Sequence, residues 1–392
     1  MSGHGCWRWS FFSPTLPTVL SHATSPVRFV VALGLAWLFT VGCSSPRTLN
    51  ECLPADGVTP ICGFQNPEDL AILPGGAWIA VSQFAGPRGA GGSLVAFRNS
   101  DDKRRMLFPP ASGAVDLSSA KPRSGWGDPA CPGPPDRSMF APHGMDVLAV
   151  KSRSPMLAVV NHGGREAIEL FEVAYATGGP ALGWRGCIPL LEEVFLNDVA
   201  LVPDGSVFAT HMMGTPGGLE GSLDVVRMFS GGDTGEVLAW RSDTGWVPVL
   251  GSEGAGPNGI AVSADGRDLY FSEWSGRRLV RMRLDASGES RRTSIELPHH
   301  PDNLNWTTDG RLLVTGQLGP LGDALACGQI ESGTCALGFS ILRVEPATLE
   351  SDVVLSHAGT AMGAASVSLQ VGDELLIGTF AGDRIARTPY TD

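Results

Sequence analysis

The sequence predicts an all-β fold, a six-bladed β-propeller whose blades are four-stranded antiparallel sheets. Three observations lead to this prediction: a turn-rich composition, a hairpin pattern that recurs along the chain, and further strand-like segments after the hairpins. The 392 residues include 51 Gly and 29 Pro, and only 17% are charged. This composition is typical of short strands joined by turns, and the 43% of hydrophobic residues exclude general disorder.

The hairpin pattern is an alternating apolar segment, a tight turn that ends in Gly, and a second apolar segment. Asp-Gly between two such segments is a strong hairpin signal. Copies with the turn glycine span Asp69–Val81, Asp198–Thr210, Gly259–Phe271, Asn303–Val314 and Ala365–Ile377. A further copy, Met145–Val160, lacks the glycine but keeps both apolar segments. The chain therefore contains six predicted hairpins.

Further predicted strands follow the hairpins, at Ser93–Phe97, Ala167–Phe171, Glu236–Trp240, Arg278–Met282, Phe339–Val344 and Arg384–Arg387. A hairpin with an outer pair of strands makes a four-stranded sheet, and six repeats of that sheet make a propeller. A two-sheet sandwich is the competing fold, but it does not predict six repeats. We assign residues 67–392 to the propeller and residues 44–66 to an N-terminal lead-in segment.

Residues 1–43 have the pattern of an export signal. The apolar segment Phe29–Gly42 follows Arg28 and is shorter than the about 20 residues that a membrane span needs. The small residue before Cys43 resembles a bacterial lipobox, which would place a lipid on Cys43 and attach the protein to a membrane. Thr40 departs from the usual Leu, so cleavage without lipidation and an uncleaved signal anchor stay open. We expect an exported protein, in the bacterial periplasm or anchored as a lipoprotein.

The cysteine content agrees with export. Six cysteines follow Cys43, and an even number in an exported chain favours disulfides. Thiolate metal binding is the alternative, but the sequence contains no Cys-x-x-Cys pair. The short spacings favour the pairs Cys52–Cys62 and Cys327–Cys335, which leaves Cys131–Cys187 as a long-range bridge.

The net charge of -12 argues against nucleic acid as a partner, because phosphates would be repelled. It suits a protein that binds cations, although many soluble proteins are acidic.

Polar residues stand where the innermost strand of each predicted blade begins, at one mouth of the central channel. The pairs at these starts are Glu68-Asp69, His143-Gly144, Asn197-Asp198, Asn258-Gly259, Asp302-Asn303 and Ala364-Ala365. A single Asp or Asn at such a position would not indicate a metal site, because both residues are common in turns before strands. Five equivalent polar positions around one axis are different, since clustered carboxylates repel one another unless a cation balances them. Oxygen donors favour calcium over zinc or copper.

Around these positions the sequence resembles the calcium-dependent paraoxonase/arylesterase family and, more broadly, the senescence-marker-protein/gluconolactonase superfamily of six-bladed propellers. The resembling segments follow one another in order from Pro67 towards the C-terminus. They are Pro67–Pro74, Pro142–Gly144, Val159–His162 with Glu169–Phe171, Leu196–Val199, Asn258–Ile260 with Asp265-Gly266, and Asp302–Leu304.

The resemblance implies two calcium ions in the channel and hydrolysis of a small lactone or aryl ester. It assigns the catalytic ion to Glu68, Asn197, Asn258, Asp302 and Asn303. It assigns a deeper, structural ion to Asp69, Asp198 and the backbone carbonyl of Met145. The paired histidines of the family correspond to His143, the general base toward water, and His162, which would orient His143 or relay its proton. His162 also has a simpler interpretation, as a polar residue at the end of a strand.

Two departures and two alternatives accompany this resemblance. The vertebrate paraoxonases close the propeller with a disulfide, but no cysteine follows Cys335 here, so we expect closure by strand pairing or packing. The three cysteine pairs are likewise not a feature of those enzymes. One alternative function is a gluconolactonase-type sugar lactonase, which uses a single metal and no histidine pair. The other is a non-catalytic envelope protein that binds a partner and uses calcium for rigidity. The presence of both His143 and His162 favours the paraoxonase-like interpretation over these two alternatives.

Overall fold

The structure is a computed structural model that describes residues 46–86, 91–113, 116–119, 121–151, 153–176, 178–190, 194–284 and 290–390. The predicted export signal, residues 1–43 with Cys43, lies outside these ranges. Within them, neither helix has the length and apolar character needed to cross a membrane.

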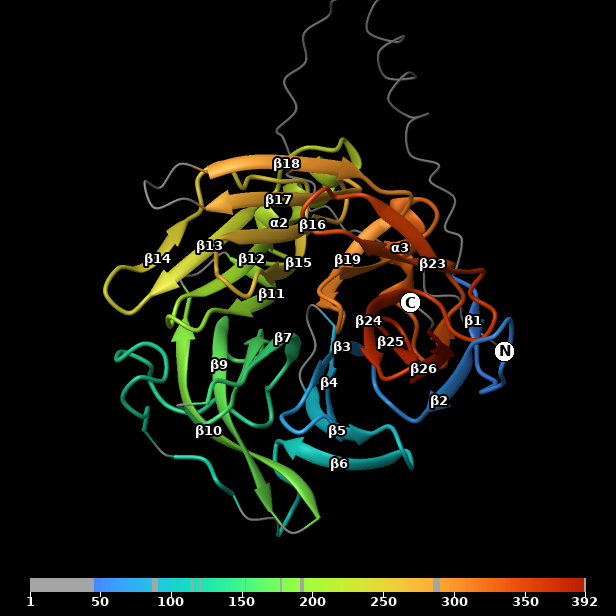
Figure 1. Ribbon diagram of the computed structural model, residues 1–392. Helices are drawn as coiled ribbons and strands as arrows, with labels where there is room; N and C mark the ends of the chain where they lie inside the picture. The colour runs from blue at the N-terminus through green and yellow to red at the C-terminus, as the bar shows by residue number, and fades with distance from the viewer. Residues whose placement is uncertain are drawn as a thin grey trace, which may run out of the picture. The chain divides into compact units, whose positions relative to one another are not determined.

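Six four-stranded antiparallel sheets form a ring of blades (Figure 1), which confirms the predicted six-bladed propeller. The first blade contains β3 (Pro67–Ile72), β4 (Ile79–Gln83), β5 (Ser93–Arg98) and β6 (Lys103–Phe108). The second contains β7 (Pro142–Leu148), β8 (Met156–Asn161), β9 (Ala167–Ala176) and β10 (Gly179–Pro189). The third contains β11 (Phe195–Leu201), β12 (Val207–Met213), β13 (Glu236–Arg241) and β14 (Gly245–Pro248). The fourth blade contains β15 (Pro257–Val262), β16 (Asp268–Glu273), β17 (Arg278–Leu284) and β18 (Ser290–Glu296). The fifth contains β19 (His300–Trp306), β20 (Leu312–Gln317), β22 (Phe339–Val344) and β23 (Ser351–His357).

The sixth blade joins the two ends of the described chain. It contains β24 (Ala365–Val371), β25 (Glu374–Thr379) and β26 (Arg384–Pro389), and its outer strand is β2 (Thr59–Cys62). In this antiparallel pair Cys62 lies opposite Arg384. The ring is thus closed by strand pairing, and part of the segment expected to lead into the propeller is a strand of its last blade.

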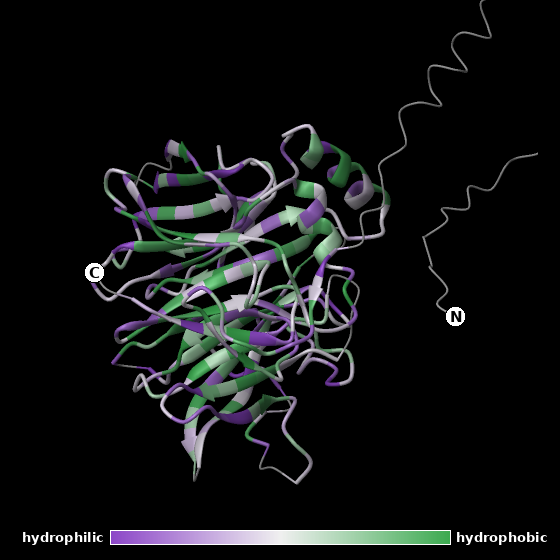
Figure 2. Ribbon diagram, turned by 90° about the vertical axis from the view of Figure 1, so that its right-hand side faces the viewer, coloured by the Kyte–Doolittle hydropathy of each residue, from purple (hydrophilic) through white to green (hydrophobic). Residues whose placement is uncertain are grey.

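The hairpin turns have the backbone conformation that their sequence predicts. Gly205 and Gly266 have φ angles of 97° and 71°, in the left-handed region that glycine adopts without strain. Blades pack face to face, so the middle strands are buried on both faces, as all residues of β4 and β20 show. Hydrophobic segments accordingly run along the strands in Figure 2.

Two segments without a predicted element contain helices. Helix α2 (Leu219–Phe229) lies between β12 and β13, and α3 (Leu321–Cys327) lies between β20 and β22. Both helices contribute to one apolar cluster, which consists of Phe195, Met213, Met228, Trp274, Leu321 and Ala324. Because Phe195 begins an inner strand, this cluster lies beside the channel mouth. A two-stranded pair, β1 (Thr48–Leu49) with β21 (Thr334–Cys335), fastens the N-terminal segment to the end of the α3 insertion.

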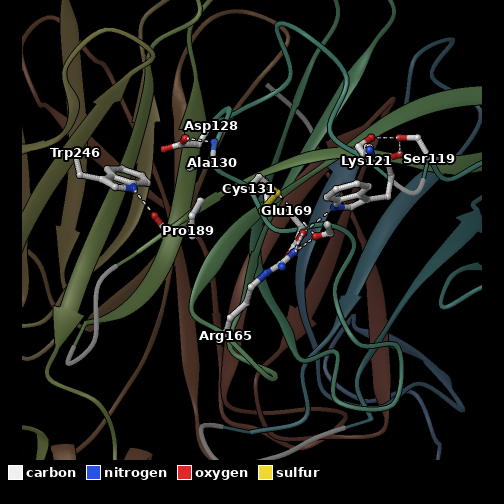
Figure 3. Close-up of a disulfide and its surroundings, with 12 residues drawn as sticks. Ser119, Lys121, Asp128, Ala130, Cys131, Arg165, Glu169, Pro189 and Trp246 are labelled. Carbon is white, nitrogen blue, oxygen red and sulfur yellow. Dashed lines mark hydrogen bonds and ion pairs between the residues drawn. A yellow bond between two sulfur atoms is a disulfide. The ribbon is translucent and has the colours of Figure 1, made fainter.

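All three predicted disulfides are present: Cys52–Cys62, Cys131–Cys187 and Cys327–Cys335. Figure 3 shows the surroundings of Cys131, whose bond to Cys187 ties the long β6–β7 connection to β10. In the same view Arg165 points to Glu169, and the two side chains form a two-pronged ion pair at 2.8 and 2.9 Å.

Arg384 anchors the N-terminal segment to the last blade. Its side chain is fully buried and donates to the carbonyl oxygens of Leu49, Glu51 and Ala361. Few side chains other than the five-donor guanidinium can satisfy carbonyls from both ends of a chain at once. Arg384 therefore reinforces the closure made by β2.

We predict that Arg384→Ala lowers the free energy of unfolding by about 3 kcal/mol, because it leaves buried carbonyl groups without donors. Urea unfolding followed by tryptophan fluorescence measures the change. The matched control is Arg241→Ala, which removes an arginine that is 55% exposed and 3.5 Å from Asp204. We expect the control to change stability by about 0.5 kcal/mol or less. Equal effects of the two substitutions would contradict the anchoring role of Arg384.

Candidate metal and histidine site

The predicted metal ligands and His143 lie in the first part of the inner strands β3, β7, β11, β15 and β19, and their side chains are buried. His162 directly follows β8 and is partly buried. At each of these strands the pairing with the next strand shifts register at the site residues, for example between Pro67 and Asp69 and between Leu196 and Val199. Such an irregularity bends a strand and changes the direction of its side chains. The bulges therefore explain how polar residues can leave the blade interfaces and point to the channel.

Glycines allow neighbouring inner strands to approach closely. A Cβ atom on Gly144 would overlap the backbone and carboxylate of Asp198, and one on Gly259 would overlap Asp302 and Asn303. The glycines that follow His143 and Asn258 are therefore required by the close approach of the next blade.

The structure brings residues that are far apart in the sequence into contact. The Nδ2 atom of Asn303 donates to Glu68 Oε1 at 2.8 Å and to the Glu68 carbonyl at 3.2 Å. Asp302 accepts a 2.7 Å hydrogen bond from Gln317 Nε2. Glu68 and Asn303, which are separated by 235 positions in the sequence, are thus in direct buried contact.

Four buried side-chain oxygens of the predicted catalytic set have no hydrogen-bond partner in the described structure. They are Glu68 Oε2, Asn197 Oδ1, Asn258 Oδ1 and Asn303 Oδ1. A buried oxygen without a donor costs free energy, and carboxylate and amide oxygens are calcium ligands. No group of three His, Cys, Asp or Glu side chains forms a metal site in the described ranges, so this donor set depends on its asparagines. The residues present fit a hard cation with oxygen ligands.

The acidic residues of the channel repel one another. Burial, followed by the charges of Asp69, Asp302 and Asp198, raises the pKa of Glu68 well above its usual value, although the Asn303 hydrogen bond opposes the shift. Burial likewise raises the pKa of Asp69 and of Asp302 to about 7. A bound divalent cation would reverse this penalty by stabilising the charged carboxylates.

Asp69 and Asp198, predicted to hold a deeper ion, are already bonded by the backbone. Asp69 accepts from the amides of Leu70 and Met145, at 2.8 and 2.7 Å. Asp198 accepts from the amides of Val199 and Ile260, at 2.8 and 2.9 Å. Asp69, Met145 and the Asp198 strand therefore lie together, but these bonds hold the carboxylates without an ion. The second calcium ion stays a prediction.

The two histidines form a chain of hydrogen bonds. His143 Nδ1 lies 2.9 Å from His162 Nε2, and His162 Nδ1 lies 2.8 Å from Glu166 Oε2. The other nitrogen of His143, Nε2, is 3.9 Å from Glu68 Oε1, on the side of the candidate metal ligands. His162 is thus more than a polar residue at a strand end. Sequence reasoning missed Glu166, whose only signal is an acid placed four residues after His162.

Aromatic rings enclose the histidine pair. Phe84 stacks on His143 with ring centres 4.3 Å apart, and Phe195 stacks on His162 at 4.0 Å. Burial, together with the neighbouring His162, lowers the pKa of His143 well below its usual value, and a backbone contact with Leu196 opposes this shift. The lowered pKa favours the neutral form of the His143 imidazole, in which one ring nitrogen has a lone pair that can accept a hydrogen bond.

Comparison with known proteins agrees with this fold. Residues 175–319 match the family model described as the SMP-30/gluconolactonase/LRE-like region, as the sequence resemblance predicts. A gluconolactonase from Xanthomonas campestris superposes with a TM-score of 0.50 and 17% identity, over 89% of this chain and 96% of that one. A luciferin-regenerating enzyme superposes with a TM-score of 0.50 and 13% identity, over 84% of this chain and 95% of that one. No curated protein sequence matches the chain.

We predict that Glu68→Gln has opposite effects with and without metal. Without metal it removes a buried, repelled carboxylate, so the free energy of unfolding should rise by roughly 1–3 kcal/mol. With calcium, the stabilisation seen in the unsubstituted protein should be lost. Thermal unfolding in EDTA and in excess calcium measures both effects.

The matched control is Glu374→Gln, on β25, where the acid bonds only to Asn99 among the hydrogen bonds observed for its side chain. It should leave the response to calcium unchanged. A Glu68→Gln protein that responds to calcium like the unsubstituted one would exclude Glu68 as a ligand.

Proposed function

We propose that this protein is a calcium-dependent hydrolase of lactones or aryl esters. The catalytic ion would be held by Glu68, Asn197, Asn258, Asp302 and Asn303. The observation that supports the proposal is a set of four buried oxygens without hydrogen-bond partners at the beginnings of the inner strands, together with the 3.9 Å between Glu68 Oε1 and His143 Nε2. Calcium takes six to eight oxygen ligands, so these side chains leave coordination positions for water and substrate.

The substrate class is supported by two independent features. The fold is shared with a solved gluconolactonase, which supports a lactone as the substrate. The histidine pair supplies a base next to the ligand set, a feature that also suits hydrolysis of aryl esters. We retain the deeper structural ion at Asp69, Asp198 and the Met145 carbonyl as part of the proposal.

The residues of the chain supply proton transfer and positioning. When bound, calcium provides a Lewis acid that polarises the substrate carbonyl and offsets the negative charge that develops on its oxygen. His143 Nε2 takes a proton from water as the water oxygen bonds to the carbonyl carbon. The bond from that carbon to the leaving oxygen then breaks, and the leaving oxygen takes the proton from His143. His162 holds the His143 ring in place through the 2.9 Å hydrogen bond.

Export belongs to the same proposal. Three disulfides suit an oxidising compartment such as the bacterial periplasm. Attachment through a lipid on Cys43 remains a prediction from the sequence.

We predict that calcium stabilises the protein and that EDTA reverses the effect. An ion that binds only the folded channel adds about 4 kcal/mol when its concentration is 1,000 times the dissociation constant. Differential scanning calorimetry over a calcium series measures the shift, and magnesium serves as the control because it prefers smaller, octahedral sites. A melting temperature that calcium and EDTA leave unchanged would refute the metal assignment.

We predict that His143→Gln lowers kcat by about 10²–10⁴-fold, because it removes the base, while the calcium-induced stabilisation stays. The assay uses phenyl acetate, γ- and δ-lactones and gluconolactone, with and without calcium. The control is His211→Gln, which changes a histidine paired with Glu236 at 3.5 Å. Turnover of gluconolactone alone, independent of His143, would favour the sugar-lactonase alternative. Calcium binding without any turnover would favour a non-catalytic binding protein.

A further inference from the structure

We propose that Glu166 is a positioning residue that fixes the tautomers of both histidines and thereby places an unprotonated nitrogen, His143 Nε2, at the candidate metal site. The catalytic meaning of this inference rests on the proposed function, but the tautomers themselves do not. The inference concerns a residue that the sequence resemblance does not include.

Glu166 is the acceptor at the end of the hydrogen-bonded series His143–His162–Glu166. A carboxylate only accepts hydrogen bonds. Glu166 Oε1 accepts from the backbone amide of Leu196 at 2.7 Å, and His162 Nδ1 lies 2.8 Å from Oε2 and 3.0 Å from Oε1. The proton of His162 must therefore be on Nδ1, which in the neutral ring leaves Nε2 as an acceptor.

The position of the proton on His162 determines the position of the proton on His143. Because His162 Nε2 has a lone pair, the 2.9 Å contact requires His143 to donate from Nδ1. A neutral His143 that carries its proton on Nδ1 has a lone pair on Nε2. That nitrogen is the one 3.9 Å from Glu68 Oε1, so the lone pair is directed towards the predicted ligand set.

The position of Glu166 is fixed by a rigid turn between β8 and β9. Asn161 is fully buried; its Oδ1 accepts from the amides of Ala141 and Gly163, and its Nδ2 donates to the Gly163 carbonyl. At the other end of the turn, Arg165 is held by the fully buried Glu169 and donates to the carbonyl of Gly133. The disulfide-bonded Cys131 is close to this contact in sequence, so the β6–β7 connection supports the turn.

The Leu196 amide couples the turn to the metal site. Leu196 directly precedes Asn197, one of the predicted calcium ligands, and its amide donates to the same carboxylate that holds His162. Glu166 thus contacts both parts of the proposed machinery, although it faces neither substrate nor ion directly. This placement is that of a positioning residue and not of a catalytic one.

The substitution Glu166→Gln is expected to move the proton from Nδ1 to Nε2 in both histidines, with almost no change in side-chain shape. If the Gln oxygen keeps the Oε1 position and its bond to the Leu196 amide, its NH₂ group takes the Oε2 position and donates to His162 Nδ1. The Oε2 position is the nearer of the two to that nitrogen, at 2.8 Å against 3.0 Å for Oε1. His162 must then carry its proton on Nε2 and donate to His143 Nδ1, which leaves the proton of His143 on Nε2. The base would be blocked while both rings stay in place.

The test is ¹⁵N NMR of histidine-labelled protein, combined with kinetics on the best substrate of the ester and lactone panel. In the unsubstituted protein we expect His162 to be protonated on Nδ1 and His143 on Nδ1. In Glu166→Gln both should be protonated on Nε2, and kcat should fall by roughly 10²-fold with KM nearly unchanged. Glu166→Asp, which keeps an acceptor, should retain the original tautomers and more activity than Glu166→Gln.

The matched control is Glu236→Gln, which changes the carboxylate facing His211 on the neighbouring blade. It should alter neither the His143 and His162 signals nor kcat. An unsubstituted protein with His162 protonated on Nε2 would overturn the inference without any variant. Unchanged tautomers in a folded Glu166→Gln protein would overturn it as well. A protein that shows the expected tautomers but hydrolyses nothing would refute only the proposed function.

Discussion

Buried oxygen atoms that meet at the inner ends of several blades are the constraint on which the rest of this structure depends. Burial raises the pKa values of Glu68, Asp69, Asp198 and Asp302, and the charges of neighbouring carboxylates add to the shift at the first three. The propeller tolerates this in two ways. Backbone amides bind the oxygens of Asp69 and Asp198, whereas the oxygens of Glu68 and three asparagines are left without donors. Those unpaired atoms are the ones that a cation with oxygen ligands would satisfy.

The architecture around the channel serves to hold this arrangement together. Bulges at the inner strands direct the polar side chains to the axis, and glycines such as Gly144 let the next blade approach. Because every blade packs only on its neighbours, a gap anywhere in the ring would open the site. The candidate site therefore depends on the closure made by β2 and reinforced by the buried Arg384.

The hydrogen-bonded histidines add a possible proton acceptor to a site that otherwise consists of acidic and amide side chains. Imidazole alone can present either nitrogen, so a base needs a partner that decides which one carries the proton. Glu166 is such a partner because a carboxylate can only accept, and the stacked rings of Phe84 and Phe195 keep both imidazoles in the planes that the hydrogen bonds require. Helices α2 and α3 pack an apolar cluster next to Phe195, which links the two insertions to the histidine pair.

The sequence by itself determined the features that depend on neighbours along the chain. Alternating apolar segments around Gly205 and Gly266 predict hairpins, equal spacing within those hairpins aligns Glu68, Asn197, Asn258 and Asp302, and the short cysteine spacings predict the disulfides. The tertiary structure decided what depends on contacts between distant segments. It placed β2 in the last blade, gave Asp69 and Asp198 their backbone donors, formed α2 and α3 in the insertions, and joined Glu166 to His162. The reason is physical: a hairpin is specified by local periodicity, but a hydrogen bond between blades exists only once the ring has closed and fixed both partners.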